Sequence, residues 1–297
     1  MTNTRFSSSL PLLLLLPAFV ILVVFTIYPT GYLLYTSLCK LFLNKPWLGQ
    51  KFIGYDNYVA ILSQARYGFW NSLRITLIFV ISAVSIEFLL GFGIALSLCV
   101  EISGRRVFRS VLIIPMMIAP VVVALMWVLI VYPGRSILNY LLSFLGMGRY
   151  EWLGDRWLAL YILMLADIWQ WTPFVMLVLL SGLLALPEEP YEAAKVDGAN
   201  NRQIFQYLTI PLLRPTILVA LLIRSIDAFR IFDKVFVITQ GGPGNSTMTL
   251  SMLIYNTAFK SMDIGKAAAL SWVLILITIG FCQALIRLTP GVIIGRK

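Results

Sequence analysis

Long apolar runs alternate with short polar segments along this chain of 297 residues. A helix of about 20 apolar residues is long enough to cross the roughly 30 Å hydrocarbon core of a bilayer. The pattern therefore predicts six membrane-spanning helices. Their approximate ranges are 10–38, 72–100, 107–131, 157–184, 211–238 and 267–288. The first run is far longer than the apolar core of a secretion signal, so we expect it to be a retained first helix.

Composition supports a membrane location. Hydrophobic residues make up 60% of the chain, charged residues only 12%, and the mean hydropathy is +0.88. Soluble domains carry about 25% charged residues, so this chain does not have enough polar surface to face water on all sides. We predict an all-α membrane protein in which residues 1–297 form one six-helix domain.

A polar segment, 187–215, separates the fourth and fifth apolar runs. Helix-forming residues from Glu192 to Val196 are followed by Gly198, which favours a helix end, and then by an amphipathic stretch that we expect to close at Pro211. The segment therefore predicts two short helices joined at a glycine bend. An ordinary amphipathic loop is the alternative.

The letters E-A-A-x-x-D-G-A from Glu192, followed by I-P-L-L-x-P up to Pro215, resemble the EAA loop of permeases in binding-protein-dependent ABC importers. The whole motif, including its I-P-L-L-x-P part, is similar to that of the permeases in this family that take up carbohydrates. The resemblance implies the six-helix fold of type I importer permeases, with 187–215 as the cytoplasmic coupling loop that meets an ATPase. The residues implied to make that contact are Glu192, Ala193, Ala194, Asp197 and Gly198.

Ionisable residues inside apolar spans must be paired or line a water-filled path, because an isolated charge in hydrocarbon is costly. In the fifth run Arg224, Asp227, Arg230 and Asp233 recur every three residues, which predicts a ladder of neutralising pairs along one helix. In the second run Glu87 leaves two interpretations open, a carboxylate on a water-filled path and a buried carboxylic acid that stays protonated. These acids also leave open a rival function, an ion-coupled secondary transporter or channel that uses Asp227, Asp167 and Glu87 as ion sites.

Resemblance to maltose-type permeases also implies where a substrate binds, since there the sugar contacts the helices before and after the coupling loop. The matching positions here are Asp167, Trp171 and Phe174 before the loop, and Arg224, Asp227, Ala228 and Ile231 after it. Each set lies on one helical face. Aromatic rings and charged groups suit a sugar's C–H face and hydroxyls.

These positions carry more charged residues than the corresponding positions of maltose-type permeases. The identity of the substrate therefore does not follow from the resemblance. Two substrate classes stay open. One is a neutral di- or oligosaccharide. The other is a phosphorylated or sulfonated polyol or sugar recognised by the guanidinium of Arg224.

Catalytic signatures are absent from the sequence. It contains no G-x-x-x-x-G-K-[ST] phosphate loop, no G-x-S-x-G, no H-E-x-x-H and no histidine. We therefore expect a non-enzymatic subunit with no cofactor and no metal of its own. Gly241 to Gly244 lacks the helix that a nucleotide fingerprint requires and is interpreted as a tight turn. The three cysteines show no metal or redox spacing.

The net charge of +10 is dispersed along the flanks of the apolar runs, which argues against nucleic acid as a partner. The resemblance implies four kinds of partner: a second homologous permease, two subunits that bind ATP and Mg²⁺, an extracytoplasmic solute-binding protein and the lipid bilayer. It also implies import by alternating access. Segments 40–67, 132–156 and 240–266 are expected to face outward.

The implied location is the bacterial cytoplasmic (inner) membrane, with several spans and both termini in the cytoplasm. Counting Lys and Arg on the two sides does not decide the orientation. The cluster of Arg105, Arg106 and Arg109 favours a cytoplasmic position for its own loop. The coupling loop sets the orientation, because a segment that meets an ATPase must lie where ATP is.

Overall fold

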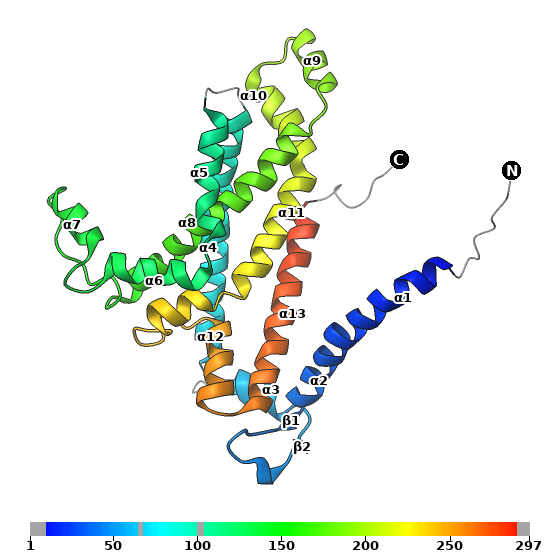
Figure 1. Ribbon diagram of the computed structural model, residues 1–297, viewed down its shortest axis with the longest axis vertical. Coiled ribbons are helices and arrows are strands. Elements are labelled where there is room, and N and C mark those ends of the chain that lie inside the picture. Colours follow the sequence, from blue (N-terminus) through cyan, green and yellow to red (C-terminus); the bar gives the residue numbers. More distant parts are fainter. Residues whose placement is uncertain (1–9, 65–67, 100–103, 290–297) are drawn as a thin grey trace. The chain divides into compact units, whose positions relative to one another are not determined.

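The computed structural model describes residues 10–64, 68–99 and 104–289, and almost all of its regular structure is helical. The chain forms two compact units. One comprises Met1–Tyr67 with Ile254–Val273, and the other comprises Gly68–Leu253 with Leu274–Lys297. Figure 1 labels the elements of both.

The first unit begins with an uninterrupted apolar helical stretch. It consists of α1 (Leu10–Leu22), the π-helical turn η1 (Val23–Ile27) and α2 (Tyr28–Ser37). The π-helical turn directly precedes α2, whose second residue, Pro29, lacks the N–H that a regular helix would use there. The helical stretch Leu15–Ser37 is long and apolar enough to cross a membrane, and the residues of its most apolar part are not buried against the rest of the chain.

The rest of this unit is held together by a strand pair and by the side chain of Asn57. Strands β1 (Cys39–Lys40) and β2 (Lys51–Phe52) pair antiparallel, with Cys39 opposite Phe52. The amide of Asn57 donates to the carbonyl oxygens of Ser37 and Cys39 at 2.8 and 2.9 Å. The remaining elements are η2 (Pro46–Leu48), α3 (Asp56–Ser63), η6 (Asn256–Lys260) and the beginning of α13 (Ile264–Leu288).

The second unit contains most of the long helices. Its elements, in order, are α4 (Phe69–Cys99), α5 (Arg105–Met117), α6 (Pro120–Val131), α7 (Ile137–Ser143), α8 (Arg156–Leu184), α9 (Glu189–Val196), α10 (Asn201–Ile204), η4 (Phe205–Thr209), α11 (Ile210–Phe229), η5 (Val235–Thr239), the start of α12 (Leu250–Tyr255) and the end of α13.

The core of the second unit lies where α4, α8 and α11 meet (Figure 1). Val175, Leu179 and Leu213 are among the fully buried side chains that fill this contact. The backbones of α8 and α11 approach closely at Gly182. A Cβ atom at that position would lie 2.6 Å from Cγ2 of Thr216, so only glycine fits.

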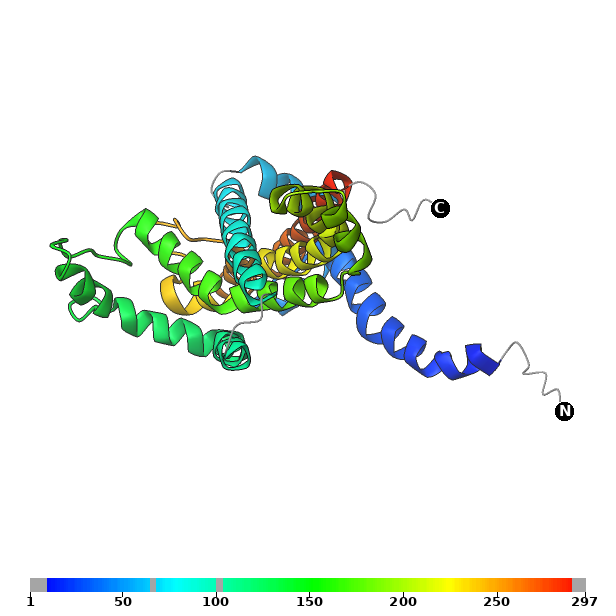
Figure 2. The same cartoon turned by 90° about the horizontal axis from the view of Figure 1, so that it is seen from above.

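The third apolar run is not the single straight helix that the sequence predicts. Helices α5 and α6 are long and apolar enough to cross a membrane only when taken together, and their directions differ by 94° (Figures 1 and 2). Pro120 begins α6, and a proline favours an extended conformation in the residue before it. The carbonyl of Ile118, left free at the bend, accepts a 2.8 Å hydrogen bond from Nε2 of Gln170. Among the described residues the spans number five, or six if this pair counts as one.

The fifth apolar run also differs from prediction at both ends. Helix is continuous from Asn201 through Pro211 to Phe229, so the expected boundary at Pro211 is wrong. The proline lies within the first two positions of α11, directly after the π-helical turn η4, where its missing N–H is tolerated. Helix α11 then ends at Phe229 rather than continuing to 238.

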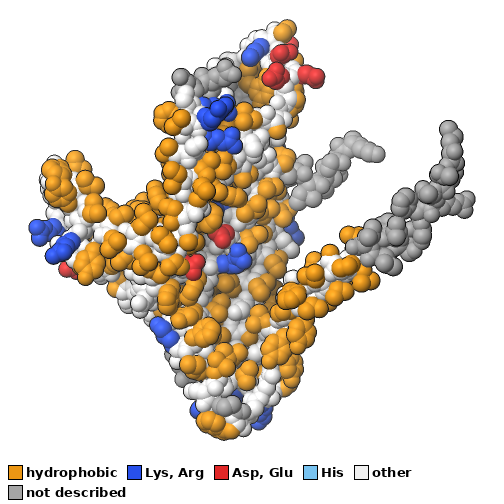
Figure 3. Space-filling view, in the orientation of Figure 1, with side chains coloured by type: hydrophobic (Ala, Val, Ile, Leu, Met, Phe, Trp, Pro, Cys, Tyr) orange, Lys and Arg blue, Asp and Glu red, His pale blue; other side chains and the backbone are white. Residues whose placement is uncertain are grey.

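The surface of the second unit matches a membrane protein. Hydrophobic side chains cover the long sides of its helices, and charged side chains gather at the end formed by α9 and the start of α5 (Figure 3). This distribution is the reverse of a soluble protein, in which exposed faces of helices are mostly polar.

Candidate functional site

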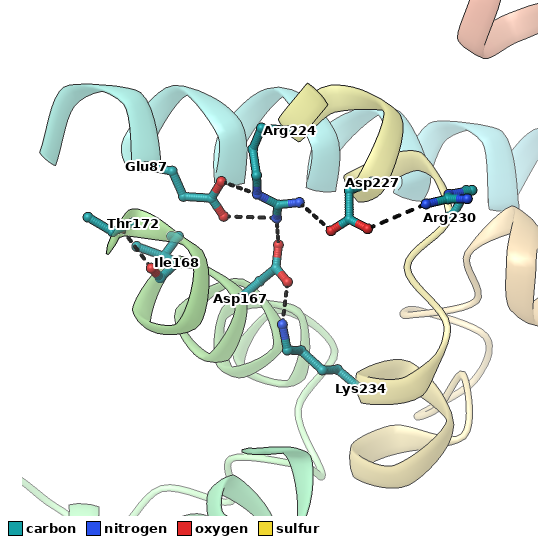
Figure 4. Close-up of polar contacts among 8 residues, drawn as sticks. All are labelled: Glu87, Asp167, Ile168, Thr172, Arg224, Asp227, Arg230 and Lys234. Carbon is teal, nitrogen blue, oxygen red and sulfur yellow. Dashed lines mark hydrogen bonds and ion pairs between the residues drawn. The ribbon is translucent and has the colours of Figure 1, made fainter. Parts of the chain in front are cut away.

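A buried ionic cluster joins α4, α8 and α11 around the guanidinium of Arg224 (Figure 4). Its Nε donates to Oε2 of Glu87 at 2.5 Å, and its Nη2 donates to Oε1 of the same residue at 3.0 Å. Nη2 also donates to the carboxylate of Asp167. Nη1 donates to Oδ2 of Asp227 at 2.9 Å. One cation therefore ties together three helices.

Lys234 adds a second cation to the cluster. Its Nζ donates to Oδ1 of Asp167 at 2.5 Å, and its side chain is only 3% exposed. Arg224 and Lys234 together balance the buried carboxylates of Glu87 and Asp167. Such balance is required here, because an unpaired charge in a low-dielectric interior costs several kcal/mol.

The cluster replaces the predicted ladder along one helix. Because α11 ends at Phe229, Asp233 does not lie on the same helix as Arg224. Within the described chain no ion pair joins Asp233 to Arg230, and Arg230 approaches Asp227 only at 3.8 Å. Arg224 finds its principal partners on α4 and α8, which no regular spacing in the sequence could indicate.

Beside the cluster lies a small polar cavity of about 80 Å³. Its lining residues are Pro120, Asp167, Trp171, Arg224, Asp227, Ala228, Arg230, Ile231, Phe232, Asp233 and Lys234. The side chain of Asp227 is 42% exposed and that of Arg230 is 70% exposed, so both can be reached from the cavity. The side chains of Arg224, Asp167 and Lys234 are at most 4% exposed.

Two aromatic side chains lie next to the cluster but differ in role. The indole of Trp171 is 5.4 Å from the guanidinium carbon of Arg224, which is within the range of a cation–π contact. Phe174 meets Trp171 edge to face at 6.3 Å and packs against the apolar core of the second unit. Trp171 therefore lines the cavity, whereas Phe174 does not.

The structure brings together six of the seven positions predicted for the substrate path. Asp167, Trp171, Arg224, Asp227, Ala228 and Ile231 line the cavity. Sequence reasoning missed Lys234, although an ammonium inside an apolar run is itself a signal. It also left the role of Glu87 open, and in the structure Glu87 accepts two hydrogen bonds from Arg224.

The polar segment 187–215 forms a compact turn. Helix α9 ends at Val196, and Gly198 follows with a φ of +78°, a conformation that glycine adopts without strain. A reciprocal pair of hydrogen bonds between Asn200 and Gln203, at 2.8 and 2.9 Å, then caps α10. The predicted glycine bend between two helices is present.

The predicted contact residues of this segment are accessible. Glu192, Ala193, Asp197 and Gly198 are exposed and Ala194 is half-buried. Val196, beside them, is 87% exposed. On the inner side, the hydroxyl of Tyr191 donates to Oγ1 of Thr209 at 3.1 Å, which ties α9 to η4. The outer surface of the segment is therefore accessible, and its inner side is fixed to η4 by the hydrogen bond of Tyr191.

No group of three or more His, Cys, Asp or Glu side chains with the geometry of a metal site occurs in the part of the chain that the structure describes. The three acids that surround Arg224 are already engaged by its guanidinium. The arrangement is suited to binding and positioning polar groups through hydrogen bonds.

Two relatives resemble the chain over most of its length. It is 41% identical to the probable ABC transporter permease protein y4oQ of Sinorhizobium fredii, over 95% of this chain and 90% of that protein. It is 36% identical to the trehalose/maltose transport system permease protein MalF of Thermococcus litoralis, over 91% and 90%.

A solved structure shares the fold. A chain of a bacterial ABC transporter involved in the import of the acidic polysaccharide alginate superposes with a TM-score of 0.80 at 22% identity, covering 96% of both chains. The all-α importer-permease fold is thereby confirmed. A family model described as "Binding-protein-dependent transport system inner membrane component" matches residues 87–289. Because this match spans well over half of its length, the chain belongs to the family of binding-protein-dependent transport system inner membrane components.

Proposed function

We propose that this chain is the permease subunit of an ATP-driven importer that moves a carbohydrate, a di- or oligosaccharide in size, across the inner membrane. The observation that carries the proposal is the polar cavity in the membrane-spanning unit, where the exposed carboxylate of Asp227 lies near the indole of Trp171. A carboxylate accepts hydrogen bonds from hydroxyls, and an indole covers the apolar face of a sugar ring. The trehalose/maltose relative supports the same substrate class.

The cavity is too small to hold a disaccharide by itself. Its volume of about 80 Å³ compares with roughly 300–1,000 Å³ for sites that enclose small ligands. We propose that this chain supplies one wall of the site, with Asp167, Trp171, Arg224, Asp227, Ala228 and Ile231 in that wall. A second, homologous permease would supply the opposite wall.

We further propose that the segment from Glu192 to Gly198 docks onto one of two ATP-binding subunits. Helix is continuous from Asn201 to Phe229, a length of about 43 Å at 1.5 Å per residue. A displacement imposed at the docking segment therefore reaches Arg224 and Asp227 through one rigid element. This continuity supports mechanical coupling and an alternating-access cycle.

The remaining parts of the assembly follow from this arrangement. ATP and Mg²⁺ belong to the ATP-binding subunits, and this chain needs no cofactor. An extracytoplasmic solute-binding protein delivers the carbohydrate to the face opposite the docking segment. Both termini of this chain then lie in the cytoplasm.

Affinity purification of the tagged chain from its native membrane tests the proposal. We expect it to bring down two copies of an ATP-binding subunit and one second permease, and the Gly198→Val variant to bring down less of the ATP-binding subunit. A chain that purifies alone and carries a solute flux driven by an ion gradient would support the rival secondary transporter and contradict the importer.

A further inference from the structure

The guanidinium of Arg224 has almost no free donor. An arginine has five N–H groups. Four of them are used in hydrogen bonds to Glu87, Asp167 and Asp227. Arg224 borders the cavity, but its side chain is 1% exposed, so the guanidinium offers a solute almost no accessible surface while the cluster is intact.

The neighbours of Arg224 hold this arrangement in place. The indole of Trp171 covers one side of the guanidinium. Lys234 engages the second oxygen of Asp167, so that carboxylate cannot turn away to release Arg224 without also breaking a 2.5 Å contact. A phosphate or sulfonate would have to displace at least one of these buried carboxylates in order to bind the arginine fork.

Six charged side chains line the cavity, three acids and three cations, but those of Asp167, Arg224 and Lys234 are buried and paired with one another. The accessible charges are the half-buried carboxylate of Asp227, the exposed carboxylate of Asp233 and the exposed guanidinium of Arg230, so acids outnumber cations by two to one. Arg230 also lies 3.8 Å from Asp227, which reduces its attraction for a further anion. Carboxylates accept hydrogen bonds from sugar hydroxyls but repel an anionic group of a ligand.

We infer that Arg224 is a positioning residue that does not touch the substrate, and that the exposed carboxylates of Asp227 and Asp233 select an uncharged carbohydrate over a phosphorylated, sulfonated or carboxylated one. The inference rests on the proposed import function. Arg224 fixes the rotamer of Asp227 through the 2.9 Å hydrogen bond to Oδ2, and Oδ1 lies 3.8 Å from Nη2 of Arg230 at the edge of the cavity.

Substrate charge is tested with the whole complex in vesicles that enclose ATP, in the presence of its solute-binding protein. The probes are pairs in which one member carries an ionised group that the other lacks: trehalose and trehalose 6-phosphate, glycerol and glycerol 3-phosphate, galactose and galacturonate, together with maltose and longer maltodextrins. We expect every imported compound to be uncharged. Import of a charged member in preference to its uncharged partner overturns the inference but leaves the import function intact. Absence of all ATP-dependent import contradicts both.

The positioning role is tested by restoring charge balance. Arg224→Gln alone leaves Glu87 unpaired in the interior, and we expect poor accumulation of that variant. In the double variant Glu87→Gln with Arg224→Gln, Asp167 is still paired with Lys234. A positioning residue predicts that this double variant assembles and imports the uncharged probe with an unchanged kcat and a KM raised about tenfold, the value of one hydrogen bond to a charged group.

The two roles of Arg224 give different outcomes in this double variant. If Arg224 instead binds the substrate directly, Asp227→Asn raises KM by the same factor in the double variant as in the parent protein, whereas a positioning role through Asp227 predicts a much smaller further rise in the double variant. Transport that tracks only the amount of assembled complex, with KM unchanged, would also overturn the positioning role, because Asp227 would then not depend on Arg224.

Discussion

Arg224 and Glu87, which are 137 positions apart in the chain, form a two-point contact in which both carboxylate oxygens accept hydrogen bonds from one guanidinium. Both side chains are essentially unexposed. This pair places the end of α11 against the middle of α4. The half-buried carboxylate of Asp227 is three residues further along α11, so the geometry of the polar cavity depends on a contact buried between α4 and α11.

Removing the central cation is expected to destabilise the second unit strongly. Arg224→Gln leaves two buried carboxylates without their main partner, and breaking a buried ion pair in this way costs about 3–5 kcal/mol. Thermal unfolding of the purified complex measures the effect. Arg230→Gln is the matched control, because that side chain is 70% exposed and its loss should change stability by less than about 0.5 kcal/mol. Equal losses in the two variants would argue against the cluster as a structural element.

Close packing of α8 on α11 makes a second prediction. In Gly182→Ala the new Cβ would lie 2.6 Å from a side-chain atom of Thr216, and overpacking of this kind costs about 1–3 kcal/mol. Gly93→Ala on α4 adds the same atom where nothing lies within 4 Å. We expect the first variant to lower the melting temperature of the complex and the second to leave it unchanged or raise it. The reverse order would show that the two helices are not in close contact.

The bend between α9 and α10 provides a test of coupling. Gly198 has a φ of +78°, which a β-branched residue adopts only with strain of about 1–3 kcal/mol. Gly198→Val should therefore reduce transport and solute-stimulated ATP hydrolysis together, while the chain still inserts into the membrane. Gly148→Val is the control, because Gly148 lies in an exposed loop with open space around it and without positive φ. Normal coupling in Gly198→Val would remove the docking segment from the mechanism.

The hydroxyl of Tyr191 connects α9, which carries the start of the docking segment, to the continuous helix from Asn201 to Phe229. Tyr191→Phe removes the 3.1 Å hydrogen bond to Thr209, which is worth about 0.5–1.5 kcal/mol. The expected result is an assembled complex that imports less solute for each ATP hydrolysed. Import and hydrolysis are measured in the same vesicles. Tyr140→Phe, which removes the hydroxyl of an exposed tyrosine on α7, is the control and should leave the amount of solute imported per ATP hydrolysed unchanged. An equal fall of this ratio in both variants would count against a role for the contact between Tyr191 and Thr209.

The parts of the fold that depend on local pattern could be predicted from the sequence. Long apolar runs gave membrane-spanning helices because length and hydrophobicity are sufficient for that. The bend at Gly198 was predictable because few residues other than glycine end a helix in this way. The faces carrying Asp167 and Trp171, and Arg224 and Asp227, followed from helical spacing.

Features that depend on contacts between distant segments could not be predicted in this way. The partners of Arg224 come from α4 and α8, and Lys234, which follows the end of α11, contacts Asp167 on α8. Spacing within one run favoured a ladder through Asp233 because it assumed an uninterrupted helix. Likewise, Pro211 was taken as a helix end, whereas the preceding π-helical turn lets the helix continue.

Uptake by reconstituted vesicles tests the central claim most directly. The complex of this chain with its second permease and ATP-binding subunits is placed in vesicles, and accumulation of a labelled carbohydrate is followed with ATP or a non-hydrolysable analogue inside. Accumulation against a gradient that requires both hydrolysable ATP and the solute-binding protein is the predicted result. Equal accumulation with the analogue, or by this chain in vesicles without the ATP-binding subunits, would contradict it.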